Sequence, residues 1–299
     1  MALKGCKRRT KGRYRKRSRT RRKLRGGSSL KDITMHILCW KSPKTLRNTL
    51  DSYRASNLLN LITPCMYIQE RTEETDLMAR EYGIDWILGG KDNVGILQAF
   101  IEMVEATTTP YFIFAECDFP VVHDEAQIKS VLEDCIKLIT QENVKVIRLR
   151  DRYNPGKPLH TRGDLNVNDE GLEAYDYTNF FSKAEMVHFV KDPEKKLPDV
   201  FTVVDAPDYN NRWYICSYEH YHWSNNIYIA ETKFMKEVIL PLVKEKHENG
   251  DETTETLLNS LERVLTHNRN VFEKEKVASG PGLFTHKRLD DCVQYCDLE

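Results

Sequence analysis

The sequence predicts an α/β fold in which a mostly parallel sheet is flanked by helices on both faces. Strand-like runs rich in β-branched and aromatic residues alternate with longer helical patterns between residues 33 and 118. This alternation is typical of parallel strands joined by crossover helices. Most of these runs end in polar residues, at the edge where such sheets bind their ligands. We therefore expect a ligand site along the carboxyl ends of the strands.

The first four strands can be assigned in order along the chain. ITMHILCW predicts the first strand, and Ser42-Pro43 followed by leucines at helical spacing predicts the first helix. CMYIQE predicts a second strand, TEETDLMAREYG a helix ended by Gly83, and DWILGG a short third strand. The helix NVGILQAFIEMVEATT and the strand YFIFAECD follow, so the strands are expected at 33–40, 65–70, 85–90 and 111–118.

The second half of the chain departs from this rhythm. A helix at 124–141 and a strand at 144–150 continue the alternation, which breaks past Asp151. Short runs at 200–206 and 212–218 suit antiparallel strands. We interpret the region after Asp151 as an addition packed on the same sheet, so that 31–299 form a single domain with halves 31–150 and 151–299.

The N-terminal tail, residues 1–30, differs in charge from the rest of the chain. Residues 1–26 hold 14 Lys or Arg and no acidic residue, which leaves 31 basic and 45 acidic side chains in the remainder, a net charge of −14. With so little apolar content the tail is expected to be disordered. Its charge suits nucleic acid, another polyanion or an anionic membrane, and a simple solubility role is the alternative.

Cysteine usage and hydropathy indicate a cytoplasmic protein. The eight cysteines are scattered without CxxC pairs, which favours reduced thiols over zinc ribbons or redox sites. No apolar run approaches the roughly 18 residues that a membrane helix needs, and the basic N-terminus does not resemble a signal peptide. We expect no transmembrane segment.

The end of the fourth strand carries two carboxylates one residue apart, Glu116 and Asp118. Positions i and i+2 of an extended chain point the same way, so both can face one divalent ion while Cys117 faces the core. Such an ion would be bound through oxygen ligands, which Mg²⁺ and Mn²⁺ prefer. The alternative is that the pair only caps the next helix, a role that Asp124 can also fill.

These motifs, in this order, resemble the nucleotide-sugar half of the GT-A fold glycosyltransferases, and most of all glycosyltransferase family 2. In that family an acidic residue ends a strand before a polar turn and helix, here Glu70 and 72–76. An Asn-x-Gly then opens the next helix, here Asn93 and Gly95, and an Asp-x-Asp follows, here the variant Glu116-Cys117-Asp118. The resemblance covers residues 33–122 well and 224–290 more loosely.

The resemblance implies a Rossmann-like GT-A fold and a metal-dependent, inverting hexosyltransferase. Such an enzyme moves a sugar from a nucleotide-diphosphate sugar to a hydroxyl of a glycan, protein or small molecule, with Mn²⁺ or Mg²⁺. The implied metal ligands are Asp118, Glu116 and His286. The implied nucleotide-sugar contacts are Cys39, Trp40, Glu70, Asn93, Gly95, Glu116 and Lys287. The simpler interpretations are a buried strand end for Cys39, a solvated acid for Glu70 and a helix cap for Asn93.

The second half should supply the base and further diphosphate contacts. Acids precede a helix in NGDETTETLLNSLERVL, where the family carries its general base, and Glu255 and Glu252 are the candidates. Capping is the competing interpretation of these acids. In GPGLFTHKRLDD the glycines permit close backbone approach, and His286 stands beside the cations Lys287 and Arg288.

A third group, YEHYHW at 218–223, contains Glu219, His220 and His222. A zinc site would need further ligands, and we favour a sugar-binding wall of aromatic residues for this stretch. Two other function classes stay open. They are a sugar nucleotidyltransferase, which should have a glycine-rich turn after the first strand, and a non-catalytic binding or packaging protein. A basic tail before a compact transferase also resembles proteins of large DNA viruses, in the host cytoplasm or the virion.

Overall fold

The computed structural model describes residues 29–156, 183–248 and 261–290. Nine strands form one sheet in the order β3-β2-β1-β4-β8-β5-β9-β7-β6. The strands are β1 (Ile33–Cys39), β2 (Thr63–Ile68), β3 (Ile87–Leu88), β4 (Tyr111–Glu116), β5 (Val144–Arg148), β6 (Thr202–Val204), β7 (Trp213–Ser217), β8 (Tyr228–Glu231) and β9 (Lys276–Ser279). The predicted α/β class is confirmed.

The first four strands run parallel, as the sequence predicts. β1 lies between β2 and β4, and Leu38 pairs with both Tyr67 and Glu116. The carboxyl ends of these three strands therefore meet at one edge. Cys39, Ile68 and Glu116 are the last residues of β1, β2 and β4, so the turns after them lie side by side.

The second half makes the sheet mixed, where the sequence predicted a mostly parallel one. β8 is antiparallel to both β4 and β5 and separates them, while β5 and β9 are parallel. The predicted antiparallel pair appears as β6 and β7, and β7 also pairs antiparallel with β9. Strands from both halves of the chain thus belong to the same sheet.

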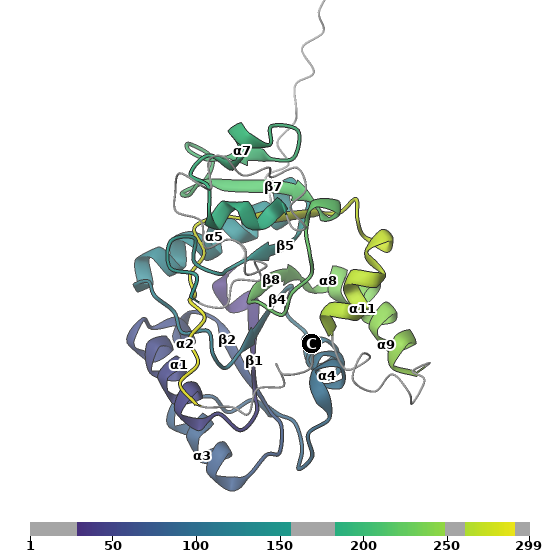
Figure 1. Ribbon diagram of the computed structural model, residues 1–299. Coiled ribbons are helices and arrows are strands. Elements are labelled where there is room, and N and C mark those ends of the chain that lie inside the picture. The colour runs from purple at the N-terminus through teal and green to yellow at the C-terminus, as the bar shows by residue number, and fades with distance from the viewer. Residues whose placement is uncertain (1–28, 157–182, 249–260, 291–299) are drawn as a thin grey trace, which may run out of the picture.

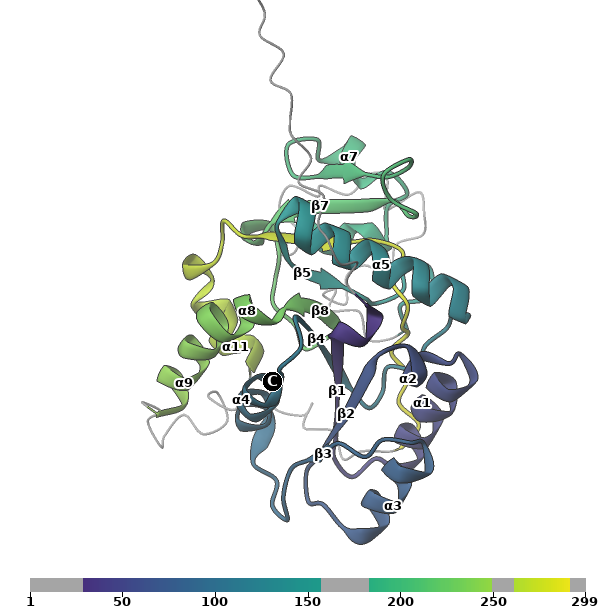
Figure 2. The ribbon, with the colours of Figure 1, turned by 180° about the vertical axis from the view of Figure 1, so that it is seen from behind.

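Helices cover both faces of the sheet (Figures 1 and 2). On one face lie α1 (Pro43–Ala55), α2 (Leu58–Leu61), α3 (Glu73–Glu81) and α5 (Glu125–Glu142). On the other lie α4 (Gly95–Ala106), α8 (Thr232–Phe234), the π-helix η5 (Met235–Ile239), α9 (Leu240–Glu248) and α11 (Leu261–His267). Within the described ranges, the remaining short helices are α7 (Pro193–Lys196) and the 3₁₀ helices η1 (Leu30–Asp32), η3 (Lys183–His188), η4 (Tyr218–His220) and η7 (Arg269–Val271).

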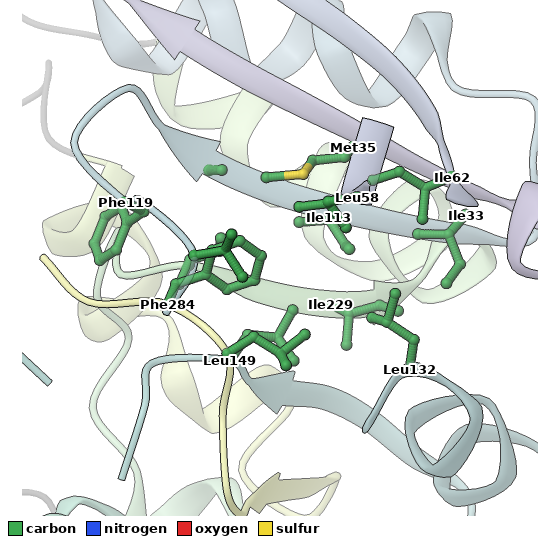
Figure 3. Packing of buried hydrophobic residues seen from close by; sticks show 14 of the residues in the cluster. Ile33, Met35, Leu58, Ile62, Ile113, Phe119, Leu132, Leu149, Ile229 and Phe284 are labelled. Atoms are coloured by element: carbon green, nitrogen blue, oxygen red, sulfur yellow. The ribbon is translucent and has the colours of Figure 1, made fainter. Parts of the chain in front are cut away.

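Each face of the sheet has its own apolar core. The core beside α1, α2 and α5 contains Met35, Leu58, Leu132 and Phe284 (Figure 3). The core on the opposite face contains residues of α4, α9 and α11. Burial of the sheet on both faces explains why β1 is buried along its whole length.

The start of α5 decides between the two interpretations of the acidic pair. Asp124 is the N-cap residue, and its side chain accepts a hydrogen bond from the Gln127 amide at 2.9 Å. Neither Glu116 nor Asp118 caps this helix. Their carboxylates therefore need another explanation.

In the ranges that the structure describes, no helix is long and apolar enough to cross a membrane. Five cysteines fall in these ranges, and all five are free and buried: Cys39, Cys65, Cys117, Cys135 and Cys216.

One buried histidine gives the fold a pH dependence. His36 is fully buried in β1, and its Nε2 lies 2.8 Å from Thr107 Oγ1. The Thr107 hydroxyl donates to the Met103 carbonyl, so it accepts from Nε2–H, while Nδ1 is buried with no partner for a second proton in the described residues. Burial lowers the pKa of His36 from 6.5 to about 3.

We expect His36→Phe to flatten the acid side of the stability curve. The folded-state pKa lies below the unfolded value, so the unfolded chain binds the proton first and stability is lost as the pH falls below about 6.5. This single group accounts for up to about 1.4 kcal/mol of unfolding free energy per pH unit. Denaturant unfolding of both proteins between pH 7 and pH 4 measures the difference. Parallel curves would contradict the buried neutral ring.

Candidate functional site

The turns after β1 and β2 form one wall of the candidate site. Trp40 Nε1 donates to Glu70 Oε1 at 3.2 Å, and Lys41 Nζ lies 2.9 Å from Glu70 Oε2. Lys41 and Glu70 both have positive φ, at 43° and 53°. The hydrogen bonds from Lys41 and Trp40 hold the pKa of Glu70 below its usual range. Glu70 is therefore a fixed, ionised acceptor beside an indole ring.

Two other predicted nucleotide contacts lie at the start of α4. Asn93 Oδ1 accepts from the Gly95 amide at 2.9 Å, and Gly95 has a φ of 77°. Gln69, at the end of β2, accepts from the Val94 amide at 2.8 Å and so ties this loop to the sheet. The N-cap residue of α4 is Val94, which makes no side-chain capping bond, and the Asn93 side chain satisfies the first helical amide instead, so the capping interpretation of Asn93 stays open.

Cys39 differs from the other predicted contacts because it is buried. Only 4% of its surface is exposed, and it belongs to the same buried cluster as Cys117, which follows the neighbouring strand β4. Both thiols belong to the core between β1 and β4. The simpler interpretation of Cys39, a buried strand end, fits this position.

Asp118 lies at the centre of the site. Its side chain is fully buried, and Oδ2 is 3.1 Å from His286 Nε2 and 3.0 Å from Arg288 Nη2. Oδ1 is buried without a hydrogen-bond partner in the described part of the chain. An ionised oxygen left unsatisfied in protein costs free energy unless a cation or a ligand completes it. The predicted meeting of Asp118 and His286, 168 positions apart, is thus present.

The two carboxylates of the pair have different electrostatics. Burial opposes ionisation of Asp118, but the hydrogen bond and charge of His286, with Arg288, outweigh it and lower its pKa. Burial and the charges of Asp118 and Glu262 raise the pKa of Glu116 to about 8. At neutral pH without a bound cation, Asp118 is ionised and Glu116 is mostly protonated.

The segment 280–290 brings His286 to Asp118. The Lys287 amide donates to the Asp118 carbonyl at 2.8 Å, and the Thr285 amide donates to the Pro120 carbonyl at 3.0 Å. Gly282 has a φ of 69°, and a Cβ there would lie 2.0 Å from the Arg150 carbonyl oxygen. The predicted close backbone approach is confirmed at Gly282. Lys287 is exposed and meets Asp118 through its backbone.

The donor set for a metal is small. Within the described ranges, no group of three or more His, Cys, Asp or Glu side chains is placed to hold an ion by itself. Asp118 and His286 form a pair, with Glu116 two residues away. Mg²⁺ typically takes one or two carboxylates together with substrate phosphates and waters. The unsatisfied Asp118 oxygen fits such an ion, with the rest of the shell supplied by a ligand.

Four charged side chains beside this centre were not predicted from the sequence. They are Arg148 and Arg150 at the end of β5, Glu185 in η3 and Glu262 in α11. The Asn225 amide donates to Glu262 Oε1, and Glu262 raises the pKa values of both Glu116 and Glu185. The pKa of Glu185 is raised to about 7, mainly by burial. Its Oε2 has no hydrogen-bond partner in the described residues.

The two arginines are held by protein groups. Arg148 donates to the Tyr221 hydroxyl and to Ser224 Oγ, the latter at 2.6 Å. Arg150 donates to Asn226 Oδ1 at 3.0 Å and to the Pro155 carbonyl at 2.6 Å. They serve as buried counter-charges to the carboxylates. Their alternation in VKVIRLR, with charges two apart in an apolar strand, was the available sequence signal.

The predicted sugar-binding wall at 218–223 is wrong. Tyr218, Tyr221 and Trp223 are at most 2% exposed, and Tyr218 packs against Trp223 and Phe272. The stretch contains a 3₁₀ helix where a strand was expected, so the rings fill the core. His220 Nε2 lies 3.0 Å from Oε1 of its neighbour Glu219. Among the described residues, this is the only ion pair that His220 forms with a carboxylate.

The predicted bases Glu252 and Glu255, like the basic tail, lie outside the described residues.

No family model matches this chain, and no curated protein matches it by sequence. Residues 1–349 of Staphylococcus aureus TarS match 85% of it with a TM-score of 0.48 and 11% identity. Glucosyl-3-phosphoglycerate synthase from Mycobacterium tuberculosis, with phosphoglyceric acid, matches 89% with a TM-score of 0.44 and 13% identity. The Pyrobaculum calidifontis mannosyltransferase PcManGT, with GDP-Man and Mn²⁺, matches 40% with a TM-score of 0.34 and 11% identity.

The chain spans only part of some of these proteins. It covers 36% of the mannosyltransferase, 60% of the TarS fragment and 79% of the synthase. The resemblance to viral proteins that the tail suggested has no counterpart in these three structures.

Proposed function

We propose that this chain is a metal-dependent glycosyltransferase that moves a sugar from a nucleotide-diphosphate sugar to an acceptor hydroxyl. The observation that carries the proposal is the unsatisfied, ionised oxygen of buried Asp118, set beside His286 and Arg288 at the carboxyl edge of the sheet. The sequence motifs at Glu70, Asn93 and Glu116 supply the likeness to glycosyltransferases.

Asp118 and His286 would hold Mn²⁺ or Mg²⁺, and Glu116, two residues before Asp118 in the chain, would contribute through a bound water. When bound, the ion supplies positive charge that neutralises the diphosphate leaving group. Arg288, now on Asp118 Oδ2, and the neighbouring Lys287 bring two further cations to the same place. The chain thus supplies two exposed positive side chains next to a buried negative one.

We assign the wall of Trp40 and Glu70 to the nucleoside. An indole ring offers a stacking surface, and an ionised carboxylate accepts hydrogen bonds from a base or a ribose. Asn93 and Gly95 would line the same pocket at the start of α4. Cys39 would support this wall from the core without touching the ligand.

We propose Glu262 as the general base, in addition to the sequence candidates Glu255 and Glu252. It is half-buried, its charge reaches Glu116 and Glu185, and the Asn225 amide fixes one of its oxygens. The other oxygen can take the proton of an acceptor hydroxyl as that hydroxyl attacks the sugar. Attack from the face opposite the diphosphate would invert the anomeric centre.

A donor screen tests this function. Purified protein with Mn²⁺ and each common nucleotide sugar should release nucleoside diphosphate slowly, because such enzymes transfer sugar to water without an acceptor. The release should stop with a chelator. If no nucleotide sugar is hydrolysed and no acceptor mixture is labelled, the enzymatic proposal fails.

Two other functions give different results in the same screen. A non-catalytic binding protein would bind a nucleotide with Mn²⁺ but turn nothing over. A sugar nucleotidyltransferase would consume nucleoside triphosphate and release pyrophosphate. The turn after β1 argues against the latter, since it has no glycine and its Trp40 and Lys41 side chains hold Glu70.

A further inference from the structure

Helix α1 does not cap its own N-terminus with a side chain. Ser42 is the N-cap residue, but its hydroxyl donates to the Trp40 carbonyl at 3.0 Å and makes no capping bond. The amide of Thr45, at the third helical position, is the group that an N-cap side chain usually satisfies. Here it donates to Asp290 Oδ2 at 2.8 Å, from a residue 245 positions later in the chain.

Thr45 both donates to and accepts hydrogen bonds from the segment that contains Asp290. Its side chain is fully buried, and Oγ1 accepts from the Leu289 amide at 2.9 Å and from the Asp290 amide at 3.1 Å. Three hydrogen bonds therefore join α1 to residues 289 and 290. We call them the clasp, and we call residues 284–290 the strap. The strap is part of the yellow line that runs toward α1 in Figures 1 and 2.

The strap is held by hydrogen bonds on both sides of Arg288. On one side, the Thr285 and Lys287 amides bond to the Pro120 and Asp118 carbonyls. On the other side is the clasp. Arg288 lies between them with 46% of its side chain exposed, although its guanidinium reaches fully buried Asp118. A long, half-exposed side chain loses rotamer freedom in such a pair, and a backbone that is already fixed spares the pair the further entropy cost of ordering the chain.

We propose that Asp290 is a positioning residue: by capping α1 it holds the strap so that His286 and Arg288 stay at Asp118. The metal part of this inference rests on the proposed function, whereas the position of the strap does not. The same helix start follows Trp40 and Lys41, so the clasp also joins the strap to the proposed nucleoside wall.

Two pairs of variants test the clasp. Asp290→Ala removes the acceptor, and Asp290→Asn keeps an oxygen that can cap the helix. Thr45→Val removes the hydroxyl at similar volume, and Thr45→Ser keeps it. The first measurement is amide hydrogen exchange in peptides covering 284–290 and the first turn of α1. Exchange there should rise at least about tenfold in the Ala and Val variants and stay near wild type in the Asn and Ser variants.

The second measurement is binding of Mn²⁺ with a nucleoside diphosphate, by calorimetry. Loss of a partner that orients a metal ligand typically lowers metal affinity roughly 10- to 100-fold, so the Ala and Val variants should show this loss and the rescuing variants should not. A purely structural role would lower the melting temperature without changing the affinity of the folded fraction. Donor KM should rise more than kcat falls.

The outcomes separate this inference from the proposed function. Unchanged exchange in Asp290→Ala, or faster exchange with unchanged Mn²⁺ affinity, overturns the positioning role. Equal losses in Asp290→Ala and Asp290→Asn also overturn it, since the cap is then irrelevant. If wild-type protein binds no Mn²⁺, the proposed metal site fails. The inference is then decided by exchange of the Lys287 amide, rising in Asp290→Ala but not in Asp290→Asn.

Discussion

Glu262→Gln is expected to lower sugar transfer by about 10² to 10⁴-fold while leaving nucleotide and Mn²⁺ binding nearly unchanged. The amide keeps an oxygen that can accept from the Asn225 amide, so the contact between α11 and the segment before β8 is retained. What the variant loses is the proton acceptor. Initial rates with a saturating donor, and calorimetry with a nucleoside diphosphate, separate these two effects.

Glu255→Gln and Glu252→Gln serve as the matched comparisons. Each removes one carboxylate from the acidic segment that precedes Glu262, and each of these two residues was a general base predicted from the sequence. If one of these variants loses transfer and Glu262→Gln keeps it, the base lies in the preceding segment and the role of Glu262 is to raise the pKa of Glu116. If none of the three substitutions changes the transfer rate, the general base does not lie in this region.

The nucleotide half was predictable because its signals are local. Helical leucine spacing, the Ser42-Pro43 start and the strand-like runs each extend over one element, and parallel connection places their ends together. The sequence alone therefore predicted that Trp40, Glu70 and Asp118 lie at one edge of the sheet. The antiparallel place of β8 was missed because its insertion between β4 and β5 is a long-range pairing.

The aromatic stretch at 218–223 shows where composition misleads. A sugar-binding wall and a core cluster use the same residues, and only burial separates them. Tyr218, Tyr221 and Trp223 pack inward because the backbone turns through a 3₁₀ helix, which breaks the strand alternation that would have exposed one face. The sequence had no turn signal strong enough to reveal this.

The four charged side chains beside Asp118 and the clasp could not be predicted from the sequence either. Arg148 and Glu262 both come near Glu185 only through the register of β5 with β8 and the packing of α11. His286 was found because glycines and cations surround it. Asp290 and Thr45 carry no motif, since capping of a helix from 245 positions away leaves no spacing to recognise.

Asp118→Asn is expected to abolish Mn²⁺-dependent nucleotide binding and to lower turnover by orders of magnitude. The substitution neutralises the only carboxylate of the pair that is ionised at neutral pH, and so removes the negative charge from the unsatisfied oxygen that fits a cation. It also removes the charge that holds His286 and Arg288. Calorimetric titration of a nucleoside diphosphate, with Mn²⁺ and with a chelator, measures the loss directly.

Two further variants show whether the loss belongs to a metal site or to the fold. His286→Ala should reproduce the weakened Mn²⁺ dependence, since both side chains would share one ion. Asp134→Asn is the control: Asp134 is equally buried, but it accepts from the Asn210 and Asn211 amides and from Trp213 Nε1 away from the site. It should lower the melting temperature and leave the Mn²⁺ affinity of the folded protein alone. Nucleotide binding that ignores the chelator in wild type, or an Asp118→Asn protein with unchanged Mn²⁺ dependence, would show that Asp118 holds no ion.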